Sequence, residues 1–182
     1  MYKIGAYNLL EAIKSFDLMT FHWCHQRKRF ALLAAAARQI SRSADGWMYL
    51  FCAFAYVALR GNAALPFISL GATAYACGRS VYFIVKNSFR RRRPTELLAD
   101  FRSVITASDR FSFPSGHTSA AFLWSGLCTM EFGAIATLPL YAWSIAVGAS
   151  RVVLGVHFPS DIAAGAMLGS VMLICVKGFI AA

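Results

Sequence analysis

The chain has 182 residues, of which 58% are hydrophobic and only 14% are charged. Soluble globular domains average about 45–50% apolar and about 25% charged residues, so this composition argues against a soluble protein and for a membrane protein. The formal net charge of +10 at pH 7 would suit nucleic acid or anionic lipid and phosphate, and so apolar a chain favours the second. The length is that of a single domain, residues 1–182.

Residues 1–45 are expected to form interfacial N-terminal helices. Apolar residues recur there at roughly helical spacing: Ile4, Leu9, Leu10, Ile13 and Phe16. This pattern predicts an amphipathic helix that lies in the membrane interface. A first helix packed on the protein itself would show the same pattern, and both interpretations stay open. Charged residues interrupt the segment, so it lacks the apolar core of a secretory signal, and the apolar run 30–37 is too short to span.

Five apolar segments follow that could cross a bilayer, which takes about 20 residues of helix. They are expected at about 46–59, 63–89, 114–131, 133–150 and from 159 onward. These runs lack the period-two alternation of membrane barrel strands. The prediction is an all-α, integral membrane helical bundle of five to six transmembrane helices over residues 46–182. The spacing of Gly165 and Gly169 suits close packing between such helices.

Five spans would bring residues 1–45, the loop 87–113 and the turn 151–158 to one side of the membrane. Basic residues gather on that side: Arg27, Lys28, Arg29, Arg38, Arg42, Arg90 to Arg93, Arg102 and Arg110. Because basic loops tend to stay inside the cell, we expect this side to face the cytoplasm of a bacterial inner membrane.

Three polar clusters lie on the same side, at 86–94, 114–117 and 150–161. In the first, Lys86 and Arg93 are seven residues apart, so two helical turns put them on one face. Two cations there could bind a phosphate, the arginine with its planar fork of donors.

The second and third clusters supply an anion site and two histidines. Pro114 suits the first position of a helix, which would leave the amides of the next three residues free to bind an anion. In the third cluster Asp161 follows His157 by four residues, so its carboxylate could hold one imidazole nitrogen and leave the other as a nucleophile. A second histidine, His117, could protonate the leaving oxygen.

The other cations are assigned separately. Arg91 and Arg92 would point away from the phosphate site and anchor the span at anionic headgroups, whereas Arg90 lies close to the catalytic face and is left undecided. Arg79, on the same face as Lys86, would either line a polar cavity or pair inside the bundle, and we favour the pairing. The short cluster His22 to His25 lacks further ligands in tetrahedral spacing, so no metal site is expected.

The motifs K-x6-R-P (86–94), P-S-G-H (114–117) and S-R-x5-H-x3-D (150–161) match without departure the three-part signature of the type 2 phosphatidic acid phosphatases. The sequence therefore resembles that family over residues 86–161, and the vanadium haloperoxidases share its site. The resemblance implies metal-independent hydrolysis of a lipid phosphate monoester or diphosphate through a phosphohistidine, with no cofactor, and makes residues 46–182 the catalytic bundle.

The resemblance also implies a role for each motif residue. His157 would be the nucleophile, Asp161 its orienter, and His117 the general acid and later the base. The remaining residues would bind the phosphate: Lys86, Arg93, Ser115, Gly116 and Arg151.

The expected partners are a lipid phosphate substrate and membrane lipids. The candidates are phosphatidylglycerol phosphate, phosphatidic acid and a polyprenyl phosphate or diphosphate, with undecaprenyl diphosphate as a specific alternative. The motifs do not distinguish among these lipids, because they would bind the phosphate and not the tail. A small transporter is the non-enzyme alternative, but only Arg79 is charged in the middle of a span. Nucleic acid is not an expected partner, because the loop 94–113 is too short to form a binding module.

Overall fold

The computed structural model describes residues 3–26, 30–98 and 101–181. Arg27, Lys28 and Arg29, counted above among the basic residues, and the side chains of Lys3 and Ile4 lie outside the described part. All regular secondary structure in the described ranges is helical, as predicted. The elements are α1 (Lys3–His25), α2 (Phe30–Arg42), α3 (Gly46–Arg60), a short 3-10 turn η1 (Gly61–Ala64), α4 (Leu65–Phe89), α5 (Pro94–Leu97), α6 (Gly116–Phe132), α7 (Ala134–Val153) and α8 (Pro159–Ala181).

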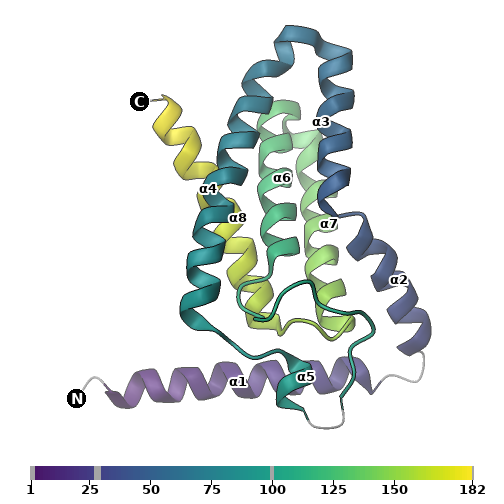
Figure 1. Cartoon of the computed structure of the whole chain (residues 1–182), viewed down its shortest axis with the longest axis vertical. Coiled ribbons are helices and arrows are strands. Elements are labelled where there is room, and N and C mark those ends of the chain that lie inside the picture. The colour runs from purple at the N-terminus through teal and green to yellow at the C-terminus, as the bar shows by residue number, and fades with distance from the viewer. Residues whose placement is uncertain (1–2, 27–29, 99–100, 182) are drawn as a thin grey trace.

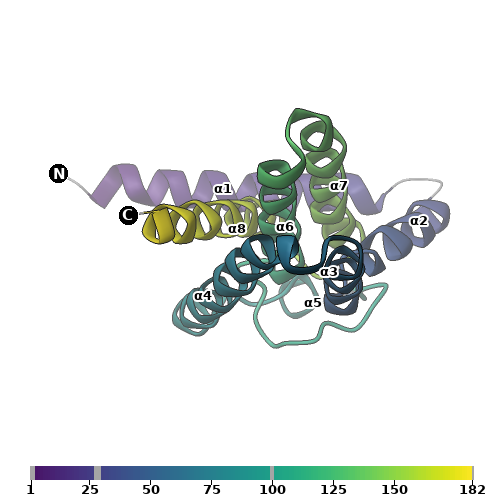
Figure 2. The same ribbon diagram turned by 90° about the horizontal axis from the view of Figure 1, so that it is seen from above.

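Helices α3, α4, α6, α7 and α8 form an elongated bundle (Figure 1), and each lies within a few residues of a predicted apolar span. Seen from above, α6 lies in the middle (Figure 2) and packs against α7, α8 and α4. Among the described residues, two helical stretches are long and apolar enough to cross a membrane, Gly46–Leu97 and Pro159–Ile180. The count of five to six spans stays a prediction.

The contact between α6 and α8 depends on glycine. A Cβ added to Gly169 would lie 2.1 Å from the carbonyl oxygen of Ser119, and one added to Gly165 would lie 2.5 Å from that of Ser115. Both distances are far inside van der Waals contact, so only glycine lets the two backbones approach this closely. The predicted close packing at these glycines is confirmed.

The outer surface of the bundle is apolar. Large side chains on the outer faces of the helices are exposed, among them Leu50, Phe54, Leu59, Ile84, Met167, Ile174 and Phe179. A soluble protein rarely exposes so much contiguous apolar surface, and a bilayer would cover it.

Helix α1 lies across one end of the bundle (Figure 1). Its Phe21 is buried and contacts the rings of Phe101 and Phe158, with centroids 4.8 and 5.6 Å apart. Its Leu9 and Phe16 are exposed. The helix therefore packs on the protein through its second half, and its location in the membrane interface stays a prediction.

Candidate active site

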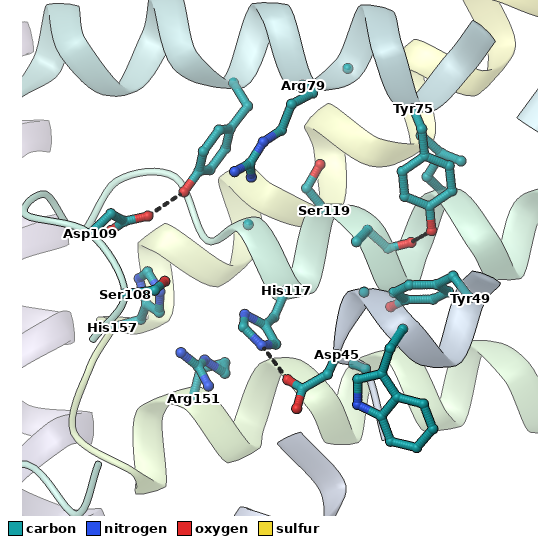
Figure 3. Close-up of a pocket in the computed structure, with 18 of the residues that line it drawn as sticks. Asp45, Tyr49, Tyr75, Arg79, Ser108, Asp109, His117, Ser119, Arg151 and His157 are labelled. Atoms are coloured by element: carbon teal, nitrogen blue, oxygen red, sulfur yellow. Dashed lines mark hydrogen bonds and ion pairs between the residues drawn. The ribbon is translucent and has the colours of Figure 1, made fainter. Parts of the chain in front are cut away.

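The three polar clusters of the sequence meet at the end of the bundle that α1 crosses. They come from the end of α4 and the segment after it, the start of α6, and the connection between α7 and α8. A cavity of about 570 Å³ opens there, and its wall includes His117, His157, Arg93 and Arg151. Figure 3 shows both histidines and Arg151 in this close-up.

The connection between α7 and α8 brings His157 and Asp161 together. The chain turns at Gly155, whose φ of +77° disfavours other residues, and a Cβ there would lie 2.5 Å from the ring of Phe101. Asp161 then lies in the first turn of α8. Its Oδ2 accepts a 2.8 Å hydrogen bond from the amide of Phe158 and lies 3.6 Å from Nδ1 of His157.

His157 is buried, and its Nδ1 has no hydrogen-bond partner within the described part of the chain. The distance of 3.6 Å to Asp161 is too long for a hydrogen bond, but a small rotation of either side chain would close it. Burial lowers the pKa of His157 to about 4, although the Asp161 carboxylate acts to raise it. The imidazole is therefore neutral at pH 7, and with Nδ1 toward the carboxylate its Nε2 can keep a free lone pair.

Arg91 contacts the same carboxylate, so the prediction that it points away from the site is wrong. Its Nη1 donates a 2.7 Å hydrogen bond to Oδ1 of Asp161, and its Nη2 lies 2.7 Å from Oδ2 of Asp17 in α1. The prediction continued a helix through the arginine run. In the structure α4 ends at Phe89, and Arg90 adopts the left-handed conformation with φ 47°. The residues directly beyond Arg90 are not helical, so helical spacing does not predict where their side chains point.

Asp17 ties α1 to the first turn of α8. It is only 1% exposed. Its Oδ1 accepts a 2.9 Å hydrogen bond from the amide of Ser160, and its Oδ2 accepts one from the Ser160 hydroxyl. Arg91 donates to that hydroxyl as well. A polar network therefore lies beside His157 and Asp161 and connects them to the N-terminal helix α1.

Arg90 and Arg92 take no part in this network. Arg90 is exposed, and its Nε donates a 2.8 Å hydrogen bond to the carbonyl of Asn87. Arg92 is exposed too, and its role as a lipid anchor stays a prediction.

Lys86 and Arg93 are both buried and meet at the carboxylate of Asp109. Lys86 Nζ lies 2.9 Å from Oδ2 of Asp109, and the hydroxyl of Tyr82 donates a 2.8 Å hydrogen bond to the same oxygen. Arg93 pairs with Oδ1 through Nη2, and its Nε donates to the backbone carbonyl of Asp109 at 3.0 Å. The two cations share a partner, a side chain of the loop before α6, although the helix on which their spacing was counted ends at Phe89.

The charge of Asp109 is well stabilised. Burial raises the pKa of this carboxyl, but the hydrogen bonds from Lys86 and Tyr82 and the charges of Lys86 and Arg93 outweigh burial and hold the pKa below its usual range. Asp109 is therefore an anion at pH 7, and it lies between the two cations that were predicted to bind a phosphate.

The start of α6 differs from the prediction. The helix begins at Gly116 and not at Pro114, and Ser115 is the N-cap. The amide of Ser115 is not free, because it donates a 3.0 Å hydrogen bond to the backbone carbonyl of Asp161. Ser115 is fully buried, whereas Gly116 lines the cavity. A Cβ on Gly116 would lie 3.2 Å from the ring of Tyr82, so the glycine leaves room for that ring.

His117 and Arg151 each have one partner from the N-terminal part of the chain. Nε2 of His117 lies 3.2 Å from Oδ1 of Asp45, which comes just before α3 (Figure 3). Arg151 Nη1 donates a 2.6 Å hydrogen bond to the hydroxyl of Ser41 in α2. Its Nε is buried and has no partner among the described residues, so a donor is left over beside the cavity.

The comparison with protein families agrees with this geometry. The model of the PAP2 superfamily matches residues 63–181, which is most of the chain. The chain belongs to the PAP2 superfamily. It is a phosphatase, and a membrane protein like its relatives.

Two relatives of this PAP2 protein are informative. The decaprenylphosphoryl-5-phosphoribose phosphatase of Mycobacterium tuberculosis is 32% identical over 149 residues, which cover 76% of this chain and 75% of the relative. Phosphatidylglycerophosphatase B of Bacillus subtilis is 33% identical over 109 residues, which cover 53% of this chain and 49% of the relative.

Two solved structures share the PAP2 fold of this chain. LpxE from Aquifex aeolicus has a TM-score of 0.76 at 21% identity, covering 89% of this chain and 94% of the other. The PAP2-type phosphatidylglycerolphosphate phosphatase of Bacillus subtilis has a TM-score of 0.67 at 23% identity, covering 99% and 88%.

The motifs of this PAP2 protein did not reveal the acidic partners of the site. Asp17, Asp45 and Asp109 contact Arg91, His117 and Lys86, and the first two precede the matched region. One feature of the sequence could have pointed to these aspartates. Acidic residues are rare in it, since the whole chain has only eight. Three of them, with Asp161 as the fourth, converge on the site.

Arg79 differs from the favoured prediction of a partner inside the bundle. Its guanidinium lies 5.0 Å from the centre of the Tyr82 ring and 4.4 Å from that of Phe83. No carboxylate among the described residues lies within ion-pair distance of it. Arg79 instead lines the cavity, which was the second of the two alternatives predicted for it.

Proposed function

We propose that this PAP2 protein hydrolyses a phosphate monoester of a membrane lipid, with His157 as the nucleophile. The observation that carries the proposal is the pair of His157 and Asp161 beside the cavity, with Nδ1 of the imidazole toward the carboxylate and the pKa of the ring far below neutral. A neutral imidazole held through one nitrogen is a nucleophile at the other.

In the first step, Nε2 of His157 attacks the phosphorus. A phosphorus–nitrogen bond forms, and the bond from phosphorus to the lipid oxygen breaks. His117 gives its proton to the leaving oxygen, so the lipid departs as an alcohol. Asp161 balances the positive charge that develops on the imidazole.

In the second step, water attacks the phosphohistidine. His117, now neutral, takes a proton from the water, and its pairing with Asp45 at 3.2 Å stabilises the resulting imidazolium. The phosphorus–nitrogen bond breaks, inorganic phosphate leaves, and His157 returns to its neutral form.

Three cations stabilise the charge on the transferred phosphoryl group. Lys86 and Arg93, which meet at Asp109, would act from one side of it, and Arg151, which lines the cavity, from another. Fixed positive groups of this kind supply most of the catalysis in phosphoryl transfer, so the proposal needs no metal or cofactor. Asp109 must share or release Lys86 and Arg93 when the phosphate enters. Gly116 would act by its amide, whereas the Ser115 side chain is fully buried and accepts a 2.9 Å hydrogen bond from the Thr118 hydroxyl.

The proposed substrate is a lipid whose phosphate lies at the polar end of the headgroup. The names of both relatives describe phosphatases of such lipids, a phosphoribose on a decaprenylphosphoryl chain and a phosphatidylglycerophosphate. A polyprenyl diphosphate, the alternative from the motifs, has less support from these names.

A phosphate-release assay tests the proposal. The purified protein in detergent, with a chelator present, would be given phosphatidylglycerophosphate, phosphatidic acid, undecaprenyl phosphate and undecaprenyl diphosphate. We expect metal-independent release from a monoester, loss of release in His157→Ala, and an acid-labile radiolabelled phosphoenzyme in the wild type. Strict metal dependence, or full activity of His157→Ala, would falsify the proposal.

We also propose that the active site faces the cytoplasm. Exposed arginines surround that end, including Arg92, Arg102 and Arg110, and basic groups favour the inner side. In a cysteine-free background, Thr106→Cys on the site loop and Asn62→Cys at the opposite end would be labelled with an impermeant reagent on intact cells. Labelling of Asn62→Cys alone is expected, and labelling of Thr106→Cys alone would reverse the orientation.

A further inference from the structure

Arg79 is a cation in the cavity wall for which the two proposed steps have no use. It shares that wall with His117 and His157, and Figure 3 shows its guanidinium pointing into the cavity between α4 and α6. It comes from α4 seven residues before Lys86, which is about 10 Å along the helix axis. At this separation Arg79 and Lys86 cannot both contact the reacting phosphate directly.

The cavity changes character along α4. The polar side chains of Arg151 and His157 lie at one end of it, and the rings of Tyr49 and Tyr75 lie at the other (Figure 3). Along α4 the wall runs from Tyr75 through Arg79 to Tyr82, and Lys86 follows one turn later. Arg79 therefore lies between the end that would hold the reacting phosphate and the apolar end that would hold the tail.

The guanidinium is free to bind an anion. An arginine among membrane helices is costly and is usually paired or functional, yet this one has no carboxylate partner within the described ranges. Its guanidinium lies over the faces of Tyr82 and Phe83, at 5.0 and 4.4 Å from the ring centres. Stacking on rings orients the planar group but leaves its N–H donors unused. Those donors match the two free oxygens of a phosphodiester.

We propose that Arg79 binds a second anionic group of the substrate, the phosphodiester that links the headgroup to the lipid tail. This inference rests on the proposed function and narrows its substrate class. The order of groups in such a lipid is monoester, polyol or sugar, phosphodiester and tail. The cavity offers His157, then the Tyr82 region, then Arg79, then the apolar end, in the same order.

The arrangement selects against other lipid phosphates. Phosphatidic acid and a polyprenyl monophosphate have only the reacting phosphate and leave Arg79 without a partner. In a diphosphate the two phosphates are bonded directly to each other. When one of them lies at His157, the other is therefore too close to His157 to reach Arg79.

The test compares two lipids in the same detergent micelles. The wild type should cleave phosphatidylglycerophosphate, which has the phosphodiester, with a higher kcat/KM than phosphatidic acid, which lacks it. Arg79→Met should lower kcat/KM for the first lipid by about 10- to 100-fold, since a hydrogen bond to a charged group is worth that factor, mainly through KM. It should leave phosphatidic acid turnover within about twofold, which also proves that the variant folds. Arg79→Lys should lose less.

The matched control is Arg92→Met, which removes the same charge from an exposed position and should lower neither value selectively. In a second measurement, phosphatidylglycerol, which has the phosphodiester and no monoester, should inhibit phosphatidic acid turnover by the wild type and not by Arg79→Met. Equal loss on both lipids, or no loss on either, would overturn the role of Arg79 while the phosphatase activity stands. A wild type that cleaves no lipid monoester would overturn the proposed function, and this inference with it.

Discussion

Arg91 and Asp161 form an ion pair with 2.7 Å between Nη1 and Oδ1, and the other oxygen of that carboxylate faces His157. The arginine is 24% exposed on its side chain and Asp161 is fully buried, so the pair holds Oδ1 while the Phe158 amide holds Oδ2. Arg91 touches no atom that reacts. Its expected role is to position the carboxylate that orients the nucleophile.

Arg91→Met should therefore lower kcat by about 10- to 100-fold, the factor for a lost hydrogen bond to a charged group, with little change in KM. Arg91→Lys should recover part of the loss. The readout specific to positioning is single-turnover phosphorylation of His157, which should slow in proportion to kcat while vanadate affinity is kept. Arg92→Met is the matched control, and an equal loss in that variant would show a general effect of charge.

Asp109 holds Lys86 and Arg93 in the structure, so it competes with an entering phosphate. Asp109→Asn should bind vanadate, used as a phosphate mimic, at least about threefold more tightly, because one unit of negative charge leaves the anion site. The inhibition constant is the measurement. Glu96→Gln, at an exposed position of α5, removes the same charge outside the cavity and should leave the inhibition constant unchanged. Weaker vanadate binding by Asp109→Asn would instead mean that the carboxylate is needed to hold Lys86 in place.

The pKa of His157 predicts how stability depends on pH. The pKa is about 4 in the folded protein and about 6.5 in an unfolded chain, so between these values the unfolded state binds more protons. Stability should then fall as the pH drops from 6.5 toward 4, by roughly 3 kcal/mol at most for this one group.

Thermal unfolding in detergent over that pH range measures this effect. His157→Asn should show a shallower loss than the wild type, and the same change at the exposed His22 should leave the slope as it was. A wild-type slope no steeper than that of His157→Asn would contradict the lowered pKa.

The glycine contact between α6 and α8 predicts a stability difference between two alanine variants. Gly169→Ala would put a Cβ 2.1 Å from the Ser119 carbonyl oxygen, and backbone atoms cannot move aside as a side chain can. We expect a loss of about 1–3 kcal/mol. Gly178 in the same helix has nothing within 4 Å, so Gly178→Ala should be neutral or slightly stabilising. Equal midpoints for the two variants would show that the helices can separate without cost.

The five helices of the bundle were predictable because each coincides with an apolar run in the sequence. The convergence of the three motifs at one end of the bundle was predictable because their polar residue types have few other uses in so apolar a chain. The errors arose where the chain leaves a helix. The left-handed conformation of Arg90 redirected Arg91 toward Asp161, and the N-cap at Ser115 moved the start of α6 two residues past Pro114. A helix end depends on a local competition of a few tenths of a kcal/mol to about 1 kcal/mol, which the pattern of apolar residues does not record.

The sequence by itself determined that this protein is an α-helical membrane phosphatase, and it predicted which histidines and cations would carry the chemistry. Only the tertiary structure decided which carboxylate pairs with which of them. Asp17 meets Arg91 across 74 positions of the chain, and Asp45 meets His117 across 72. Ion pairs over such separations depend on how helices pack, and each acidic residue has many basic candidates in a chain of charge +10. Packing also placed the Arg79 side chain in the wall of the cavity, whereas the favoured prediction was a partner inside the bundle.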